Sequence, residues 1–362
     1  MRPALRAGLL PLWRDRDTLQ FGVDPRRAVA LGGLGPAAAV ISLLDGSRDR
    51  DGLIATAQAY GIPGDAVSRV LVLLADAGVL DDFPLGLRAC LPDRVRARLA
   101  PELATAALAY GSGDGGARFL ARRRGAFVRI HGAGRTGACL ASFLAASGVG
   151  HVACLDPSPA EPADLAPAGL IEADLGAPRE EGAGRAVGRA APWCRTDDDG
   201  TVPDVVVLTR PMLPDLTDGL LRDRVPHLAV AAGEAIGVIG PLVRPGRSAC
   251  RRCINLRKAD ADPAWPKILA QATFARVQPE ACDTVLAAMT AALACAQALA
   301  LIDRAASSAL VTVNGTLESV LPDWQWRRRT WLPHPLCPCG AAYRDGSFDG
   351  RLRRNDAVTE AP

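Results

Sequence analysis

The chain has 362 residues, too many for one small core and enough for two or three domains. Hydrophobic residues make up 49% of it and charged residues 22%, which is typical of a soluble globular protein. The formal net charge is only +3, so the total charge gives no support to a nucleic-acid-binding function.

Three features of the sequence bear on its compartment. The start, residues 1–17, becomes charged too soon and has too short an apolar part for a signal peptide. Residues 285–302 are the most apolar long run, but small residues dominate it, so we expect a buried core helix rather than a membrane span. The ten cysteines follow no framework of small-domain spacings, which favours a reducing cytoplasm and no membrane partner.

The first part of the chain predicts small strands followed by helices. Alternating and apolar runs predict two strands, at 18–23 and 28–31. Apolar residues at helical spacing predict three helices, at 36–44, 49–60 and 65–77. A short closing strand, or wing, is expected at 79–80. This order indicates a small winged-helix-like α+β domain, which we place at residues 1–83.

A winged-helix shape first suggests DNA binding, but the third helix argues against it. Its residues 68–74 include one basic side chain, Arg69, whereas base and phosphate contacts need several Arg, Lys, Asn or Gln side chains. An apolar helix beside an exposed strand edge better suits a peptide that adds as an extra strand. The candidate peptide contacts are Val29, Leu31, Val67, Val70, Leu71 and Leu74. The alternative is that this domain only packs on the next one.

Residues 84–125 are expected to link the two folded parts. They include a helix at about 95–109 and a loose, glycine-rich segment at 111–116. The run of three arginines at 122–124 is most simply a solvated edge.

The segment 126–156 predicts a strand, a glycine-rich turn, a helix and a second strand. Gly132, Gly134 and Gly137 have the G-x-G-x-x-G spacing, and Asp156 ends the second strand. In such a turn the first glycine permits the tight bend, the second lets a ligand approach the backbone, and the third lets helix and strand pack closely. The helix start suits a phosphate, and the acid accepts a hydrogen bond from a ribose hydroxyl. We therefore predict a nucleotide-type fold.

Strands continue to alternate with helices after this unit. Unbroken apolar runs predict two further strands, at 204–209 and 227–231, and helices are expected at 176–189, 213–224 and 284–302. Residues 310–317 and 324–331 alternate like an antiparallel pair. The fold class is thus α/β, a Rossmann-like parallel sheet with an antiparallel C-terminal extension over residues 126–340. Residues 341–362 are polar at their end and predict a disordered tail.

Two short cysteine pairs predict a metal site. Cys250 and Cys253 form C-x-x-C, and Cys337 and Cys339 form C-x-C before a glycine. Four thiolates in loop-like surroundings can hold a tetrahedral Zn²⁺, which would be structural because no ligand position stays open. A redox C-x-x-C and unrelated buried thiols are the alternatives. His334, close to the second pair, is a candidate to support the ligands.

The glycine turn, Asp156, the strand 204–209 and the two cysteine pairs together resemble the ThiF/MoeB family, adenylating enzymes related to ubiquitin activation. Residues 237–253 carry the most specific part of this resemblance. The first domain resembles the PqqD-like leader-peptide recognition module of ribosomal-peptide modification systems. The whole chain is therefore similar to the ThiF-like partner proteins of azole-forming (TOMM/RiPP) peptide clusters, which carry a leader peptide to an ATP-using cyclodehydratase. The family also implies a homodimer.

The resemblance implies four further groups in members that adenylate a C-terminal carboxylate with ATP and Mg²⁺. They are a second acid two positions after the ribose acid, an Asn-Leu-x-Arg-Gln stretch, a lysine that follows it, and a magnesium-binding Asp after the apolar strand. Ser158 stands at the first position, and residues 160–164 lack the stretch. No lysine occurs before Lys258, and Arg210 and Pro211 follow the strand. Arg135 or Arg179 could replace one cation, but no residue replaces the metal ligand.

We therefore predict an adenylation-deficient, zinc-braced scaffold that binds a precursor peptide and presents it to a cyclodehydratase-like enzyme. One alternative is an active ATP-dependent adenylyltransferase acting on the C-terminal carboxylate of a peptide, or of a ubiquitin-like or sulfur-carrier protein. Another is a nicotinamide or flavin oxidoreductase, which would need a catalytic residue on the hydride side. His131, His151 and His227 adjoin strands and are expected to complete strand-end packing instead, and Cys282 is a remaining candidate thiol.

Overall fold

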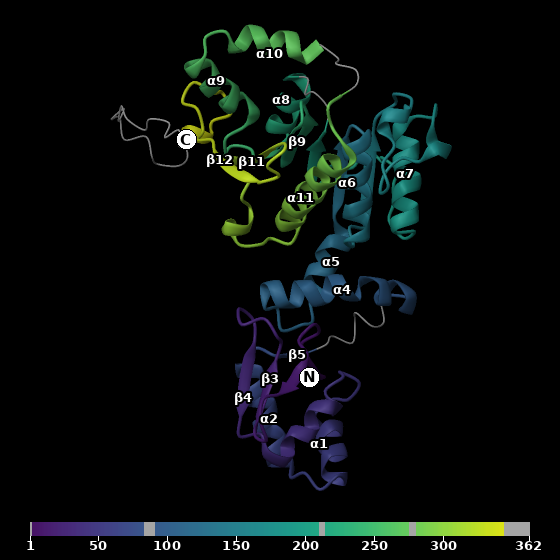
Figure 1. The fold of residues 1–362 in the computed structure, drawn as a ribbon, viewed down its shortest axis with the longest axis vertical. Helices are drawn as coiled ribbons and strands as arrows, with labels where there is room; N and C mark the ends of the chain where they lie inside the picture. The colour runs from purple at the N-terminus through teal and green to yellow at the C-terminus, as the bar shows by residue number, and fades with distance from the viewer. Residues whose placement is uncertain (1, 83–90, 210–213, 275–279, 344–362) are drawn as a thin grey trace. The chain divides into compact units, whose positions relative to one another are not determined.

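The computed structural model describes residues 2–82, 91–209, 214–274 and 280–343, and the chain divides into two compact units (Figure 1). The first unit is Met1–Gly125 and the second is Ala126–Pro362. The two units thus divide at residue 125, where the α/β domain is expected to begin, and the helices of the expected linker at 84–125 belong to the first unit. Most of the tail predicted at 341–362 falls outside the described residues, and Ala341–Tyr343 forms a short 3₁₀ turn, η5.

The first unit contains two small sheets. A three-stranded antiparallel sheet consists, in spatial order, of β2 (Pro11–Trp13), β3 (Thr18–Phe21) and β4 (Val29–Gly32). A second, two-stranded sheet pairs β1 (Pro3–Leu5) with β5 (Leu80–Asp82) in antiparallel fashion. The closing strand predicted at 79–80 thus pairs with the start of the chain. Beside this pair, the Arg6 guanidinium and the buried Asp81 carboxylate lie 3.0 Å apart.

The helices of this unit largely follow the predicted ranges. They are the 3₁₀ helix η1 (Gly35–Leu43), α1 (Arg50–Ala59), α2 (Gly64–Asp76), α4 (Asp93–Tyr110) and α5 (Ala117–Gly125). Asp49 caps α1, because its carboxylate accepts a 2.8 Å hydrogen bond from the amide of Gly52. Fully buried side chains of β3, α1 and α2, among them Phe21, Leu53 and Leu74, form the core.

Helix α5 corrects one expectation. Arg123 is only 8% exposed and its guanidinium lies 3.3 Å from the carboxylate of Glu102 on α4, so the arginine run is not a uniformly solvated edge. The rings of Tyr110 and Phe119 stack 4.4 Å apart between the same two helices. An ion pair and an aromatic contact therefore join α4 to α5.

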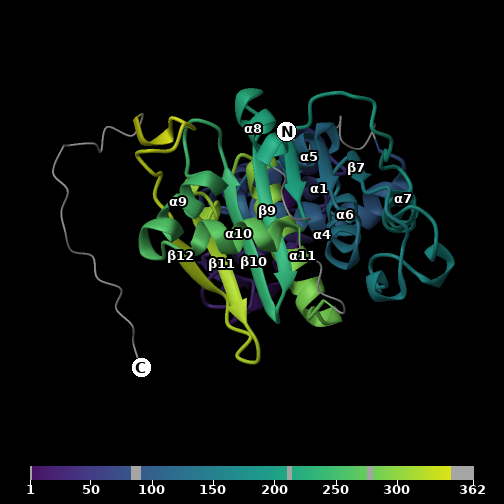
Figure 2. The same cartoon turned by 90° about the horizontal axis from the view of Figure 1, so that it is seen from above.

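The second unit is built on one seven-stranded sheet, which confirms the predicted α/β class. Its strand order is β12-β11-β10-β9-β8-β6-β7. Four strands run parallel, namely β6 (Phe127–His131), β7 (His151–Leu155), β8 (Val205–Leu208) and β9 (His227–Gly233). Three follow in antiparallel pairing, namely β10 (Ile236–Val243), β11 (Gly315–Val320) and β12 (Arg327–Thr330), and Figure 2 shows them side by side with β9.

Helices cover this sheet. They are α6 (Arg135–Ala146), α7 (Arg179–Ala190), α8 (Pro214–Arg222), α9 (Arg251–Ala261), α10 (Trp265–Phe274) and α11 (Thr284–Ile302). Three short 3₁₀ turns accompany them, at Pro162–Asp164, Glu172–Asp174 and Ser307–Ala309. Alternate residues of β10 point to opposite faces, so Ile239 packs with α11 while Ile236 and Val238 lie on the other face.

Helix α11 is a core helix of this unit. Among the described residues it alone is long and apolar enough to cross a membrane, and 56% of its most apolar window is buried. Its buried residues, including Ala291, Ala294 and Ala298, pack with Leu140 and Leu144 of α6. The packing confirms the expectation of a buried helix at residues 284–302.

Candidate functional site

The glycine turn connects β6 to α6. Gly132 has a φ of +101°, a conformation that favours glycine. A Cβ at Gly137 would lie 2.0 Å from the Gly132 carbonyl oxygen, which no side chain could tolerate. Gly134 precedes the first residue of α6, and a Cβ there would lie 3.1 Å from the Asp164 carboxylate. The three glycines therefore allow the strand, the turn and the helix to pack against one another.

Asp156 holds this turn from the end of β7. Its carboxylate is buried. It accepts a 2.9 Å hydrogen bond from the amide of Ala133 and a 3.3 Å hydrogen bond from the amide of Ser158. The guanidinium of Arg179 lies 3.7 Å away, and the Asp156 amide donates to the carboxylate of Glu180 at 2.7 Å. The acid predicted to meet a ribose hydroxyl is thus already bonded to the protein itself.

The two candidate replacement cations are also engaged. Arg135 donates from Nε to the carbonyl oxygen of Ala163 at 2.8 Å and from Nη1 to that of Cys282 at 3.1 Å. Arg179 donates from Nε to Asp164 at 2.7 Å. A phosphate approaching the turn would compete with these bonds.

Carboxylates outnumber cations around the turn. Four acidic side chains and two arginines gather there among the described residues: Asp156, Asp164, Glu180 and Glu280, with Arg135 and Arg179. Burial, and then the charge of Asp164, raises the pKa of Glu280, and the two arginines oppose this shift. When all of these described groups are ionised their charges sum to −2, which disfavours a triphosphate beside them. Arg210 and Pro211, at the expected magnesium ligand, lie outside the described residues.

Sequence reasoning missed three of these acids. Asp164 lies directly in front of the turn only because the 3₁₀ turn at Pro162–Asp164 places it there, with its carboxylate accepting from the Glu161 amide at 2.9 Å. Glu180 begins α7, and Glu280 precedes α11, far along the chain. No local spacing connects them with the glycines, so only the fold reveals the excess of negative charge.

The four predicted cysteines come together. Their sulfurs all lie within 4.8 Å of one another, with 3.8 Å between Cys250 and Cys253, 3.5 Å between Cys250 and Cys337, and 3.5 Å between Cys253 and Cys339. Zn–S bonds of about 2.3 Å would separate the sulfurs of a tetrahedral site by about 3.8 Å. A disulfide needs about 2.05 Å, so the spacing fits a metal and excludes a disulfide.

The surroundings of the cluster also suit a structural metal. Cys250, Cys253 and Cys337 are buried, and they pack with Trp331 in a small core. Hydrogen bonds among the neighbouring thiols lower the pKa of Cys253 and raise the pKa of Cys250, so the thiols of the cluster ionise unequally. If Zn²⁺ binds there, these thiolates would hold it with no position left for substrate.

His334 braces the loop that carries the second cysteine pair. Its Nε2 lies 2.9 Å from the carboxylate of Asp260 on α9, and its Nδ1 accepts a 3.1 Å hydrogen bond from the Leu336 amide. Arg257 of the same helix donates to the carbonyl oxygens of Leu332 and Pro333 at 2.8 and 2.9 Å. The loop after β12 is therefore fixed to α9 by hydrogen bonds as well as by the cysteines.

The histidines beside the strands serve packing. The ring of His151 stacks on Phe127 with 3.9 Å between the centroids, and its Nε2 contacts the carbonyl oxygen of Asp197. His227 is buried with Nδ1 3.1 Å from the Val225 carbonyl oxygen, and burial lowers its pKa. For these two residues the structure confirms strand-end packing.

Cys282 is poorly suited to nucleophilic catalysis. Burial, followed by the charge of Glu280, raises the pKa of its thiol to about 11. Relative to a thiol with the ordinary value of 9.0, the thiolate fraction at pH 8 is lower by about 100-fold. We expect iodoacetamide to alkylate Cys282 about 100-fold more slowly than free cysteine, with a rate that rises until pH 11. Peptide mass spectrometry measures this rate, and rapid alkylation at pH 7 would contradict it.

The predicted peptide contacts need a correction. Val67, Val70, Leu71 and Leu74 are at most 4% exposed because this face of α2 forms the unit's own core. The exposed apolar side chains of α2 are instead Val72 and Leu73, at 57% and 41%. On β4, Val29 and Leu31 are half-buried against the same core. The apolar pattern of α2 therefore marks the face that this helix buries in the core of its own unit.

The sheet and the glycine turn together define a Rossmann-like α/β fold. The family model described as "ThiF family" matches residues 113–200, which include the glycine turn and Asp156. No curated protein matches the sequence.

Solved structures share this architecture across both units. Escherichia coli MccB with ATP is 17% identical with a TM-score of 0.65, over 94% of this chain and 99% of that one. The microcin C7 biosynthetic enzyme MccB in complex with N-formylated MccA is 18% identical with a TM-score of 0.64, over 94% and 100%. PaaA is 14% identical with a TM-score of 0.64, over 90% and 98%. These likenesses show a common fold.

Proposed function

We propose that this protein is a ThiF-like carrier that binds a precursor (leader) peptide and presents it to a partner modifying enzyme without adenylating it. The excess of carboxylates at the glycine turn carries this proposal. Arg135 and Arg179 are both bonded to protein groups, and four acids surround them. Transfer of an adenylyl group needs cations that neutralise the phosphates, and neither arginine is free to do so.

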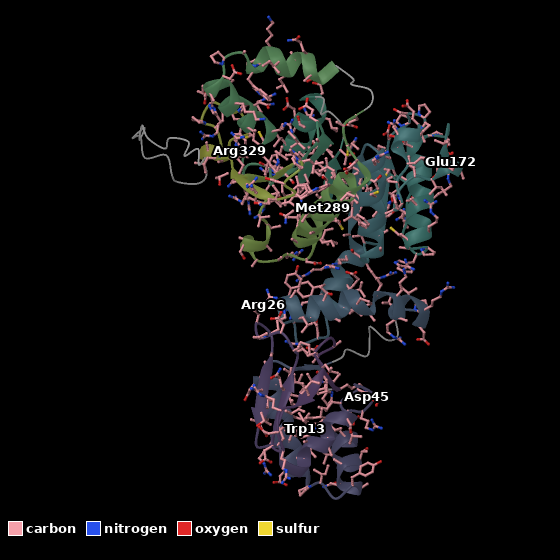
Figure 3. The ribbon with its side chains drawn as sticks, in the orientation of Figure 1. Trp13, Arg26, Asp45, Glu172, Met289 and Arg329 are labelled. Atoms are coloured by element: carbon pink, nitrogen blue, oxygen red, sulfur yellow. The ribbon has the colours of Figure 1, made fainter. Side chains whose placement is uncertain are left out.

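The first unit offers the features that a bound peptide strand requires. Strand β4 is hydrogen-bonded only to β3 among the described residues, so its other edge can pair with a peptide. Exposed apolar side chains on the unit include Leu12, Trp13, Val72 and Leu73, with Trp13 labelled in Figure 3. The likeness to MccB, solved in complex with MccA, supports a peptide as the partner.

Further parts of the proposal come from the sequence. The resemblance to ThiF-like partner proteins implies a cyclodehydratase-like partner enzyme and a homodimer. The cysteine pattern favours the cytoplasm, and the low net charge gives no support to nucleic acid as a ligand. The last point agrees with α2, whose one arginine, Arg69, is ion-paired with Asp65 on the same helix.

A peptide-capture experiment tests the proposal. Candidate leader peptides, taken from any short open reading frame next to the gene and labelled with a fluorophore, are titrated with the full chain in the absence and presence of ATP and Mg²⁺. We expect the same affinity in both cases. Val72→Asp places a charge on the exposed apolar face of α2 and should weaken capture by about tenfold. Val202→Asp is the matched control, because Val202 is 77% exposed in the second unit and should leave affinity unchanged.

The alternative of an active adenylyltransferase is tested by a second assay, because MccB has been solved with ATP. That function requires ATP–pyrophosphate exchange that depends on a carboxylate-ended peptide and is lost in Asp156→Ala. Exchange with these two dependences would overturn the carrier proposal. Capture that is equally weak in both valine variants would remove α2 from the peptide site.

A further inference from the structure

A cavity lies on the face of the sheet opposite α11. Its volume is about 260 Å³, and strands β9 to β12 and helix α9 line it. The apolar side chains of Ile236, Val238 and Ile254 contribute to its floor. The lining also includes three cations, Arg251, Lys258 and Arg329, and Figure 3 labels the last of these on β12.

Within the described part of the chain, the cations of this cavity form no ion pair with a carboxylate. Glu318 is the carboxylate among the lining residues, and its Oε1 accepts a 2.6 Å hydrogen bond from the hydroxyl of Thr316. No ion pair joins Arg251, Lys258 or Arg329 to a carboxylate within the part of the chain that the structure describes. With three cations and one carboxylate, the lining sums to +2.

Aromatic rings hold two of these cations in place instead. The Lys258 ammonium lies 4.2 Å from the ring centroid of Trp265, and the Arg329 guanidinium lies 4.4 Å from that of Trp331. Trp331 is itself fixed, because its indole Nε1 donates to the Thr316 hydroxyl at 2.9 Å. A cation over a ring keeps its N–H donors available, so they can bind an anion.

The cations also oppose one another. Burial, and then the charges of Arg251 and Arg329, lowers the pKa of Lys258, while Glu318 acts in the opposite direction. Three like charges beside an apolar floor are unfavourable unless a negative group enters between them, because the floor keeps water from screening them. The lining is thus incomplete without an anion.

We propose that this cavity binds an oxyanion, either as a free phosphate-type ion or as a carboxylate on an acidic peptide. Its volume of about 260 Å³ exceeds that of a water, about 30 Å³, by enough to take such a group together with part of what carries it. The site shares no lining residue with the glycine turn. It therefore stands independently of the proposed carrier function.

The chain provides an internal control for a test of this site. Its only lysines are Lys258 and Lys267, and Lys267 is exposed on α10 and does not line the cavity. The intact protein is acylated with an N-hydroxysuccinimide ester, and peptide mass spectrometry follows each lysine. At a concentration of inorganic phosphate that occupies four-fifths of the sites, the acylation rate of Lys258 should fall about fivefold. The acylation rate of Lys267 should stay unchanged.

Two peptides distinguish the sources of the anion. A blocked Gly-Glu-Glu-Gly peptide is compared with its Gln-Gln analogue. Protection of Lys258 by phosphate alone identifies a free ion as the ligand, and protection by the glutamate peptide but not by its analogue identifies a peptide carboxylate. Either result supports the oxyanion site. Protection by neither anion, or equal protection of both lysines, overturns it.

A pair of variants separates binding from a merely structural role of the cations. Arg329→Gln should abolish protection of Lys258. Arg327→Gln should keep it, because Arg327 is on the same strand but is paired with Asp323 at 2.7 Å and does not line the cavity. Thermal unfolding and the acylation rate of Lys267 show whether each variant is folded. Full protection in a folded Arg329→Gln protein would contradict the proposal.

Discussion

Replacing Cys253 with serine is expected to lower the melting temperature of the second unit by on the order of 10 °C and to abolish stoichiometric zinc. Its sulfur lies 3.5 Å from that of Cys339 and 3.8 Å from that of Cys250, so it connects both cysteine pairs. Structural zinc sites contribute several kcal/mol or more to folding, because the ligands are gathered only in the folded chain. Losing one thiolate would leave the loop after β12 attached to α9 only by the hydrogen bonds of Arg257 and His334.

Calorimetry and atomic absorption check this expectation. Cys194→Ser is the matched control, because Cys194 is half-buried, is not part of the cluster and should retain both zinc and melting temperature. A chelator should reproduce the loss in the wild-type protein. Wild-type protein that contains no zinc, and whose melting temperature ignores the chelator, would contradict the assignment of the site.

Substituting alanine for Gly137 is expected to destabilise the second unit by more than about 4 kcal/mol, or to prevent soluble expression. The added Cβ would lie 2.0 Å from the carbonyl oxygen and 2.9 Å from the carbonyl carbon of Gly132. Both are backbone atoms at the end of β6, so no side-chain rotation can relieve the overlap. The strand and helix α6 would have to separate, which opens the central core.

Urea unfolding measures the effect, and a second glycine supplies the control. Gly188 is on α7, where a Cβ would meet no atom within 4 Å. Gly188→Ala should therefore stabilise the unit slightly, by about 0.5–1 kcal/mol, since alanine favours the helix. If Gly137→Ala and Gly188→Ala unfolded at the same urea concentration, the overlap of a Cβ with the Gly132 backbone could not be the reason for a glycine at position 137.

The features with short-range patterns were predictable from sequence. The G-x-G-x-x-G turn, the apolar strand at residues 204–209 and the long helix at 284–302 each have a period or spacing that one element imposes. Helix α9 was not predicted, because Arg251–Ala261 is mostly polar and shows no broad apolar stripe. The charge balance at the turn was only partly predictable, since Glu280 reaches it from far along the chain.

Helix α2 shows a different limit. An apolar stripe on a helix is the usual sign of the face that it buries against its own core, and a peptide-binding face is chemically similar. The sequence could not tell the two apart, and Val67 and Leu74 proved to be core residues. The exposed Val72 and Leu73 are consecutive and break the helical period, so periodicity alone passes over them.

The bond from the Ala133 amide to Asp156 has a wider consequence. Asp156 directly follows β7, whereas Ala133 follows β6, so this bond couples the two strands at a point beyond their backbone ladder. A change at residue 156 would therefore also displace the turn from which α6 begins.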